Sequence, residues 1–135
     1  MDLAICSFDK QTHLLEFAAV HNPMYLVRGD ELIQHKADII PIGEPFNDEF
    51  PSYKNNELEV LSGDIIYMFS DGYSDQFGGP NKKKFMSKQF REVLLANSKK
   101  SMDEQKNTLE STFENWKDTI EQFDDVTVMG VKFSF

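Results

Sequence analysis

The sequence predicts an α+β fold in which antiparallel β-sheets pack against helices. Polar and apolar residues alternate through much of the first third of the chain, as they do in half-buried strands. Two segments with helical periodicity follow beyond residue 87, and one more alternating segment ends the chain. Strands that are followed by helices and a last strand are typical of α+β folds, whereas parallel sheets alternate strand and helix throughout.

The composition is that of one packed globular domain over residues 1–135. The chain is 40% hydrophobic with 12 phenylalanines, too much apolar surface for a disordered protein. A formal net charge of -9 argues against nucleic-acid binding, because phosphate backbones repel carboxylates. Cys6 has no second cysteine for a disulfide, and the longest apolar run, Ile65–Phe69, is far shorter than the roughly 20 residues that span a bilayer. We therefore expect a cytoplasmic protein, with no membrane contact by this segment.

Two β-hairpins are predicted at the start of the chain. Segments 3–8 and 13–20 flank one polar turn, and segments 24–28 and 31–36 flank the turn Gly29-Asp30. Such short spacing favours antiparallel neighbours. Residues 41–56 contain three prolines and no periodicity, which indicates a surface excursion.

The middle of the chain predicts a central strand. Residues 57–60 alternate like a half-buried strand, and Ser62-Gly63-Asp64 forms a turn. The run Ile65–Phe69 is continuously apolar, as in a strand that is covered on both faces. Asp64, like Asp30, is interpreted as a hairpin-turn residue.

Two helices and a strand complete the prediction. Ser87 is expected to cap the first helix, and Ser101 with Glu104 forms a capping box for the second. A final strand is predicted over residues 126–133 by its alternation. The inward apolar faces of the two helices comprise Phe90, Val93 and Leu94, and Leu109, Phe113, Trp116, Ile120 and Phe123.

Two acidic motifs lie where apolar strands meet loops. Asp71 and Gly72 follow the central strand, and Asp124 and Asp125 precede the last one. If these two strands pair antiparallel, Asp71 and Asp124 meet at the same end of the sheet. Two close carboxylates favour a cation between them, and Mg²⁺ and Mn²⁺ prefer oxygen ligands. Gly72 lets the backbone approach such an ion closely.

Each of these features also has an ordinary interpretation. Asp-Gly and Asp-Asp are common in solvated turns. The lysines at 82–84 form either a solvated loop or a surface for an acidic phosphoprotein. His13, His21 and His35 lack metal-ligand spacing and are expected in turns or on strand surfaces. Cys6 is expected to be a small buried residue.

The acidic motifs and their order resemble a known family. The run Ile66 to Asp75 resembles the strand and Ser-Asp-Gly motif of SpoIIE-type phosphatases, which are PP2C-like, and residues 124–128 resemble their terminal Asp-Asp-hydrophobic-Thr motif. His21-Asn22-Pro23 is similar to the family's Gly-His-Asn-Pro-like turn, and Pro41-Ile42-Gly43 to its Pro-Leu-Gly element. The resemblance covers essentially the whole chain.

This resemblance implies that residues 1–135 are the C-terminal part of a PP2C-like phosphatase domain, a partial αββα sandwich. It implies a binuclear Mn²⁺ or Mg²⁺ site with Asp71 and Asp124 as catalytic ligands, beside Gly72. Asp75 and Asp125 would support the ligands. A metal-activated water would attack phosphoserine or phosphothreonine, in a substrate of the anti-sigma-factor-antagonist kind. The form of the motif resembles that of large bacterial sensor proteins.

One departure from the family is an absence. The family carries a further metal-binding Asp in an upstream Gly-Asp…Gly-His-Gly motif, and neither Gly29-Asp30 nor Gly63-Asp64 is followed by the His-Gly. We therefore expect weak metal binding and little turnover by this chain alone, and an unpaired sheet edge that favours a homodimer. The alternatives are a non-catalytic interaction or sensor-assembly module, and a simple cation-binding turn protein.

Overall fold

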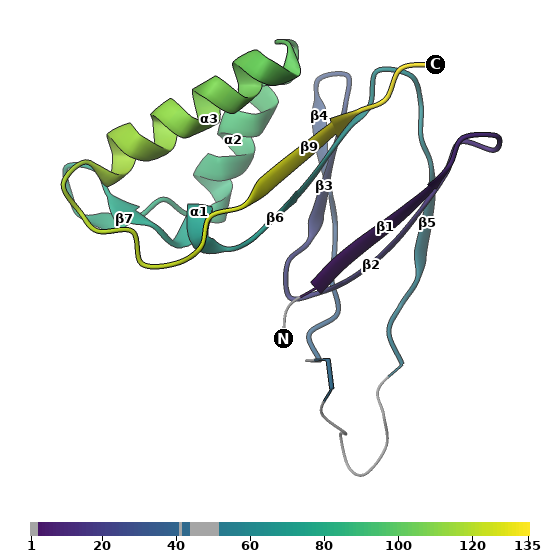
Figure 1. The fold of residues 1–135 in the computed structure, drawn as a ribbon, viewed down its shortest axis with the longest axis horizontal. Helices are drawn as coiled ribbons and strands as arrows, with labels where there is room; N and C mark the ends of the chain where they lie inside the picture. Colours follow the sequence, from purple (N-terminus) through teal and green to yellow (C-terminus); the bar gives the residue numbers. More distant parts are fainter. Residues whose placement is uncertain (1–2, 41, 44–51) are drawn as a thin grey trace.

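Two antiparallel sheets and a layer of helices lie side by side in the structure (Figure 1), a computed structural model that describes residues 3–40, 42–43 and 52–135. The first sheet has the order β1-β2-β5, with strands Leu3–Asp9, Leu14–Val20 and Asn56–Glu59. The second has the order β4-β3-β6-β9, with strands Glu31–His35, Met24–Arg28, Ile65–Phe69 and Val128–Lys132. The predicted α+β class is confirmed.

The helices lie on the face of the second sheet that points away from the first. They are α1 (Gly72–Asp75), α2 (Ser87–Asn97) and α3 (Met102–Lys117), and a small ribbon of β7 (Phe77–Gly78) and β8 (Lys83–Lys84) joins the first two. The sequence predicted only a loop between β6 and α2, so α1 and the ribbon are additions. Within the part of the chain that the structure describes, no helix is both long enough and apolar enough to cross a membrane.

Both predicted hairpins are confirmed. Strand β1 pairs antiparallel with β2, with Leu3 opposite Val20, and β3 pairs antiparallel with β4, with Met24 opposite His35. Strand β5 pairs with β2, so the turn that follows it carries the chain from the first sheet to the second. In the predicted surface excursion, Pro41 and residues 44–51 lie outside the described residues.

Strand β6 is central and covered on both sides, as predicted. Its Ile66 packs between the two sheets, in a core that includes Phe17 and Met24. Its Ile65 and Tyr67 face the helices, in a core built mainly from aromatic rings. Because successive strand residues point to opposite faces, only a continuous apolar run satisfies both cores. The helix-side core consists of Tyr25, Val27, Ile65, Tyr67, Tyr73, Phe85, Phe90, Leu94 and Phe113.

The starts of the two long helices were predicted with different success. The capping box of α3 is confirmed, because Ser101 Oγ accepts the Glu104 N–H at 3.3 Å and the Glu104 carboxylate accepts the Ser101 N–H at 2.9 Å. The prediction that Ser87 caps α2 is wrong. Met86, with φ of 75°, occupies the N-cap without a side-chain hydrogen bond, and Ser87 is the first helical residue.

Helix α3 ends earlier than predicted. The carbonyl of Trp116 would accept the N–H of residue 120 in a longer helix, but it accepts the Gly79 N–H at 2.8 Å instead. Asp118 then adopts a φ of 49°, which turns the chain away. The predicted inward face is therefore wrong for Phe123, which is 70% exposed.

Asp64 is more than the turn residue that was predicted. Its side chain is 2% exposed and accepts a hydrogen bond from Arg28 Nη2 at 2.6 Å. It also accepts the N–H of Leu61 at 2.8 Å. Leu61, Ser62 and Gly63 of the turn are exposed, and only Asp64 is buried, where the chain passes from β5 in the first sheet to β6 in the second. By contrast, Asp30 lies in an exposed turn beside Lys99.

The last strand is shorter than predicted but keeps the predicted alternation. Val126 and Val128 pack against the helix-side core, and Phe133 lies between the sheets. Met129 is 47% exposed and Val131 38% exposed. These two residues share the face of Phe133, but the three-stranded first sheet leaves this part of β9 uncovered.

Candidate functional site

The pairing of β6 with β9 brings the two acidic segments together. Phe69 at the end of β6 lies opposite Val128 at the start of β9, and the Ser70 N–H donates to the Thr127 carbonyl at 3.0 Å. Asp71 follows this pair on one strand, and Asp124 and Asp125 precede it on the other. Both segments therefore lie at the same end of the sheet, as the sequence predicted (Figure 1).

The hydroxyl of Ser70 fixes the two segments to each other. Ser70 Oγ donates to the Asp125 carbonyl at 2.8 Å and accepts the Thr127 N–H at 2.9 Å. The first of these bonds joins the residue before Asp71 to the residue after Asp124. Sequence reasoning gave Ser70 no role of its own, and the only signal was its place between the strand and the acid.

Gly72 makes the closest backbone approach at this site. A Cβ on Gly72 would lie 2.4 Å from the carbonyl oxygen of Asp125 and 3.0 Å from its carbonyl carbon. Real Cβ atoms do not approach backbone so closely, so a larger residue would push the segments apart. The close approach seen here is to Asp125, and a role for Gly72 at a metal stays a prediction.

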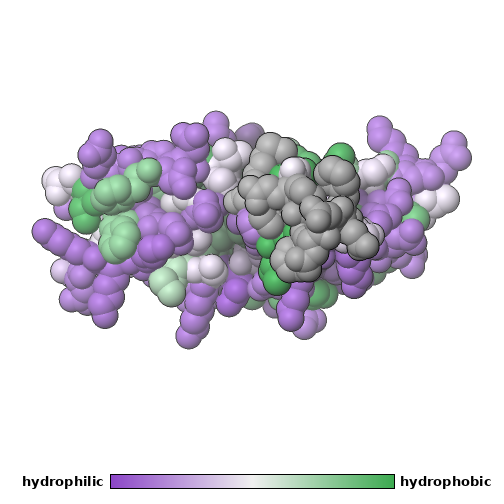
Figure 2. Space-filling view, turned by 90° about the horizontal axis from the view of Figure 1, so that it is seen from below, coloured by the Kyte–Doolittle hydropathy of each residue, from purple (hydrophilic) through white to green (hydrophobic). Residues whose placement is uncertain are grey.

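The side chains of Asp71, Asp124 and Asp125 are exposed at this end of the sheet, which we call the acidic rim. Asp71 occupies the N-cap of α1, but its carboxylate makes no capping hydrogen bond. One oxygen of Asp124, Oδ1, accepts the Asp125 N–H at 2.7 Å. At the end of the molecule that carries the helices, Figure 2 shows hydrophilic residues mixed with a smaller number of hydrophobic ones.

The donor chemistry of the acidic rim fits a hard divalent cation only in part. Mg²⁺ and Mn²⁺ favour carboxylate and water oxygens, which exposed aspartates provide. Over residues 3–40, 42–43 and 52–135, however, no three His, Cys, Asp or Glu side chains are grouped to hold one ion. The described residues thus supply part of a ligand set, and the remaining positions would need water or groups from elsewhere.

Asp75 and the lysine run form a separate ion pair. Lys84 Nζ lies 2.8 Å from Asp75 Oδ2 and ties α1 to β8. The support from Asp75 to metal ligands that the sequence predicted stays untested. Lys84 is thus engaged within the chain, and recognition of an acidic substrate by the lysines stays untested as well.

The histidines and the cysteine lie away from the acidic rim. His13 and His21 are turn residues with φ of 57° and 68°, and His35 ends β4. Burial lowers the pKa of His35, and the nearby Arg28 charge lowers it further. Cys6 is half-buried on the edge strand β1, with its thiol 3.3 Å from the sulfur of Met68, and burial raises its pKa.

Comparison with known protein families assigns the chain to one of them. The family described as Stage II sporulation protein E (SpoIIE) matches residues 1–134. The chain belongs to the SpoIIE family. A comparison with curated proteins gives no match.

Solved structures agree with the SpoIIE assignment. The SiaA-PP2C domain of Pseudomonas aeruginosa superposes with a TM-score of 0.89 and 26% identity, over 98% of this chain and 51% of that one. The SpoIIE phosphatase domain of Bacillus subtilis gives 0.71 and 21%, over 98% and 56%. The Mycobacterium tuberculosis serine/threonine phosphatase PstP/Ppp gives 0.55 and 18%, over 99% and 60%.

These matches confirm the PP2C-like, SpoIIE-type resemblance. The SpoIIE chain described here spans only a little more than half the length of each of these structures.

Proposed function

We propose that this SpoIIE-family chain supplies one part of the active site of a metal-dependent protein serine/threonine phosphatase. The observation that carries the proposal is the pair of Ser70 hydrogen bonds that hold the Asp71 and Asp124 segments side by side. Membership of the SpoIIE family and the PP2C-like fold support a phosphatase role for these two acidic segments.

We infer that Asp71 and Asp124 hold Mn²⁺ or Mg²⁺, as part of a binuclear site in a complete domain. Such ions, when bound, would activate a water molecule and offset charge on the phosphoryl oxygens. The chain's own contribution is to place two carboxylates on one rim without neutralising them by a lysine or arginine. The described ion pairs of the chain involve neither Asp71 nor Asp124.

We infer the substrate class from one related structure and from the family resemblance of the sequence motifs. PstP/Ppp is described as a serine/threonine phosphatase, and we extend phosphoserine and phosphothreonine proteins to this chain as substrates, including an anti-sigma-factor antagonist. The chain by itself supplies too few ligands for a firm site, so we infer weak metal binding and little turnover in isolation.

Activity measurements test this function directly. In a protein where this chain forms part of a complete PP2C domain, Asp71→Asn and Asp124→Asn should each lower Mn²⁺-dependent hydrolysis of a phosphoserine peptide. The loss should exceed the roughly 10- to 100-fold typical of residues that only support a ligand. Asp30→Asn, in an exposed turn beside Lys99, is the matched control and should leave the rate unchanged.

The same experiment separates the alternative functions. Unchanged hydrolysis in Asp71→Asn would refute the role of that carboxylate. A complete domain that binds phosphoprotein but hydrolyses nothing with Mn²⁺ would favour a non-catalytic interaction module. Rapid Mn²⁺-dependent hydrolysis of p-nitrophenyl phosphate by the isolated chain would contradict its inferred inactivity.

A further inference from the structure

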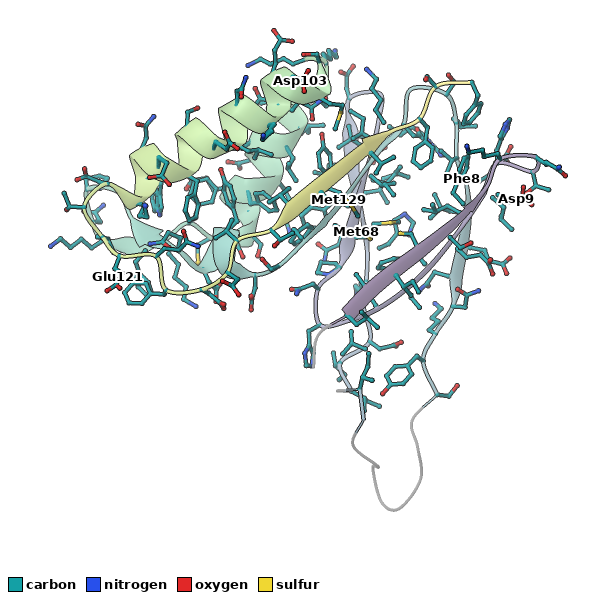
Figure 3. The ribbon with its side chains drawn as sticks, viewed as in Figure 1. Phe8, Asp9, Met68, Asp103, Glu121 and Met129 are labelled. Atoms are coloured by element: carbon teal, nitrogen blue, oxygen red, sulfur yellow. The ribbon has the colours of Figure 1, made fainter. Side chains whose placement is uncertain are left out.

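Three sulfur atoms meet in the core between the two sheets. Cys6 Sγ, on β1 of the first sheet, lies 3.3 Å from Met68 Sδ and 3.9 Å from Met24 Sδ, both in the second sheet. Met24 is 0% exposed, whereas Cys6 and Met68 are half-buried and pack against this core. Figure 3 labels Met68 on β6. None of the three residues belongs to the acidic rim.

The strand pairing holds the two methionines side by side. Tyr25 of β3 lies opposite Tyr67 of β6. In an antiparallel pair the next residues, Met24 and Met68, therefore also lie opposite each other, on the other face of the sheet. That face is the one toward the first sheet, where Cys6 of β1 also packs. The three sulfurs thus come from three strands of two sheets, and regular elements rather than a loop position them.

A nitrogen donor lies on the same face of the second sheet. His35 of β4 is the direct partner of Met24 of β3, so their side chains point to the same side. Within the part of the chain that the structure describes, His35 Nε2 is the buried side-chain polar atom that has no hydrogen-bond partner. Buried polar atoms are nearly always satisfied, and a bound ion is one explanation for an atom that is not.

The chemistry of these donors selects a soft monovalent cation. Thiolate and thioether ligands prefer Cu⁺, and imidazole also binds copper, whereas Mg²⁺ and Mn²⁺ require oxygen ligands. Cu⁺ on one thiolate gives a neutral group, because thioethers and a neutral imidazole add no charge. A divalent ion at the same place would leave a net positive charge in an apolar core, which is costly.

The spacing of the sulfurs is close to what one ion needs. At a metal–sulfur distance of about 2.3 Å, three sulfurs in a plane around one ion lie about 4 Å apart. The distance of 3.9 Å between Cys6 and Met24 already meets this spacing. The distance of 3.3 Å between Cys6 and Met68 must lengthen, which the rotatable bonds of a methionine side chain permit.

We propose that Cys6, Met24 and Met68 bind one Cu⁺ ion between the sheets, with His35 Nε2 as the nitrogen donor on the same face. Binding replaces the thiol proton of Cys6 with Cu⁺, and the proton passes to solvent. The ion joins β1 to the second sheet and so stabilises the packing of the two sheets. This site is separate from the acidic rim and does not depend on the proposed phosphatase function.

Competition with the chromophoric Cu⁺ chelator bicinchoninate, under anaerobic conditions, measures the affinity of the chain for Cu⁺. We expect one Cu⁺ per chain, an affinity that excess Mg²⁺ does not change, and shifts of the Met24 and Met68 methyl signals in ¹H–¹³C spectra. Bound Cu⁺ should also raise the Tm of the chain, because a ligand that binds only the folded state stabilises it.

Conservative variants separate the contributions of the donors, with ¹H–¹⁵N spectra to check that each variant is folded. Met24→Leu and Met68→Leu nearly preserve side-chain volume, and each should weaken Cu⁺ binding about tenfold or more. Cys6→Ser should weaken it further, since it removes the thiolate that neutralises the ion. His35→Leu should weaken it as well. Met86→Leu is the matched control, because Met86 is 59% exposed at the start of α2, and should leave the affinity unchanged.

Three outcomes would overturn the proposal. Full affinity in folded Met24→Leu and Met68→Leu would show a simple adduct of the Cys6 thiol instead of a shared site. Equal weakening by Met86→Leu would show that the loss is not specific to these sulfurs. Full affinity in folded His35→Leu would refute the assignment of the nitrogen donor.

Discussion

At the residue scale, the acidic rim depends on two small residues beside the acids. Ser70 supplies a hydroxyl that bonds to both the Asp125 carbonyl and the Thr127 N–H. Gly72 has no side chain, and α1 can therefore begin in contact with the backbone of Asp125. The position of the two carboxylates therefore follows from the contacts that Ser70 and Gly72 make with the backbone of the segment before β9.

Gly72→Ala tests this dependence. The added Cβ would meet the Asp125 carbonyl oxygen at 2.4 Å, so the segment before β9 must move. We expect a loss of about 1–3 kcal/mol in the free energy of unfolding, measured in urea, and weaker Mn²⁺ binding by electron paramagnetic resonance. Gly29→Ala is the control, because its φ of 60° costs about 1 kcal/mol without any contact near the acidic rim. Weaker Mn²⁺ binding in both variants would show that lost stability, rather than the local clash, is responsible.

The sequence indicated some of these residues and not others. Asp71 and Asp124 could be predicted because each follows or precedes a strongly apolar strand, and antiparallel pairing places them at one end of the sheet. The role of Ser70 could not, because its hydrogen bonds join segments that only the fold brings together. The same holds for the contact of Gly72 with Asp125.

At the element scale, the strands were predicted better than the ends of the helices. The continuous apolar run of β6 predicts that both faces of the strand are buried, and both faces contact a hydrophobic core. The end of α3 depends on Gly79, which is distant in the sequence. The Gly79 N–H donates to the Trp116 carbonyl, which would otherwise accept a hydrogen bond within the helix. The turn at Asp64 has the composition of a hairpin, and nothing local shows that it crosses between sheets.

The Arg28–Asp64 ion pair joins β3 to this crossing turn. Asp64→Ala should destabilise the protein by about 2–4 kcal/mol, because it leaves a partly buried guanidinium and the Leu61 N–H without their acceptor. Urea denaturation measures the change. Asp30→Ala removes an exposed pair with Lys99 and should cost less than about 1 kcal/mol. Equal effects of the two substitutions would contradict the importance of the buried Asp64 carboxylate and its pair with Arg28.

At the scale of the whole molecule, the arrangement of the layers determines which faces of the sheets are covered and which surfaces are exposed. One helical layer covers the second sheet, and the first sheet covers most of its other face (Figure 1). The exposed Leu3 and Ile5 on β1, and Met129 and Val131 on β9, mark apolar surface at the outer strands of both sheets. The related phosphatase structures are almost twice as long as this chain. The acidic rim is open to ligands from outside the chain.

The most direct test of a shared metal site is paramagnetic broadening of ¹H–¹⁵N signals while Mn²⁺ is added to the chain. We predict that the amides of residues 70–73 and 124–127 broaden together at the lowest Mn²⁺ concentrations, and that Asp71→Asn protects both groups from broadening. Broadening of only one of these two groups, or broadening that begins along α3 near Asp103, Glu110 and Glu114, would contradict the claim that Asp71 and Asp124 hold the same ion.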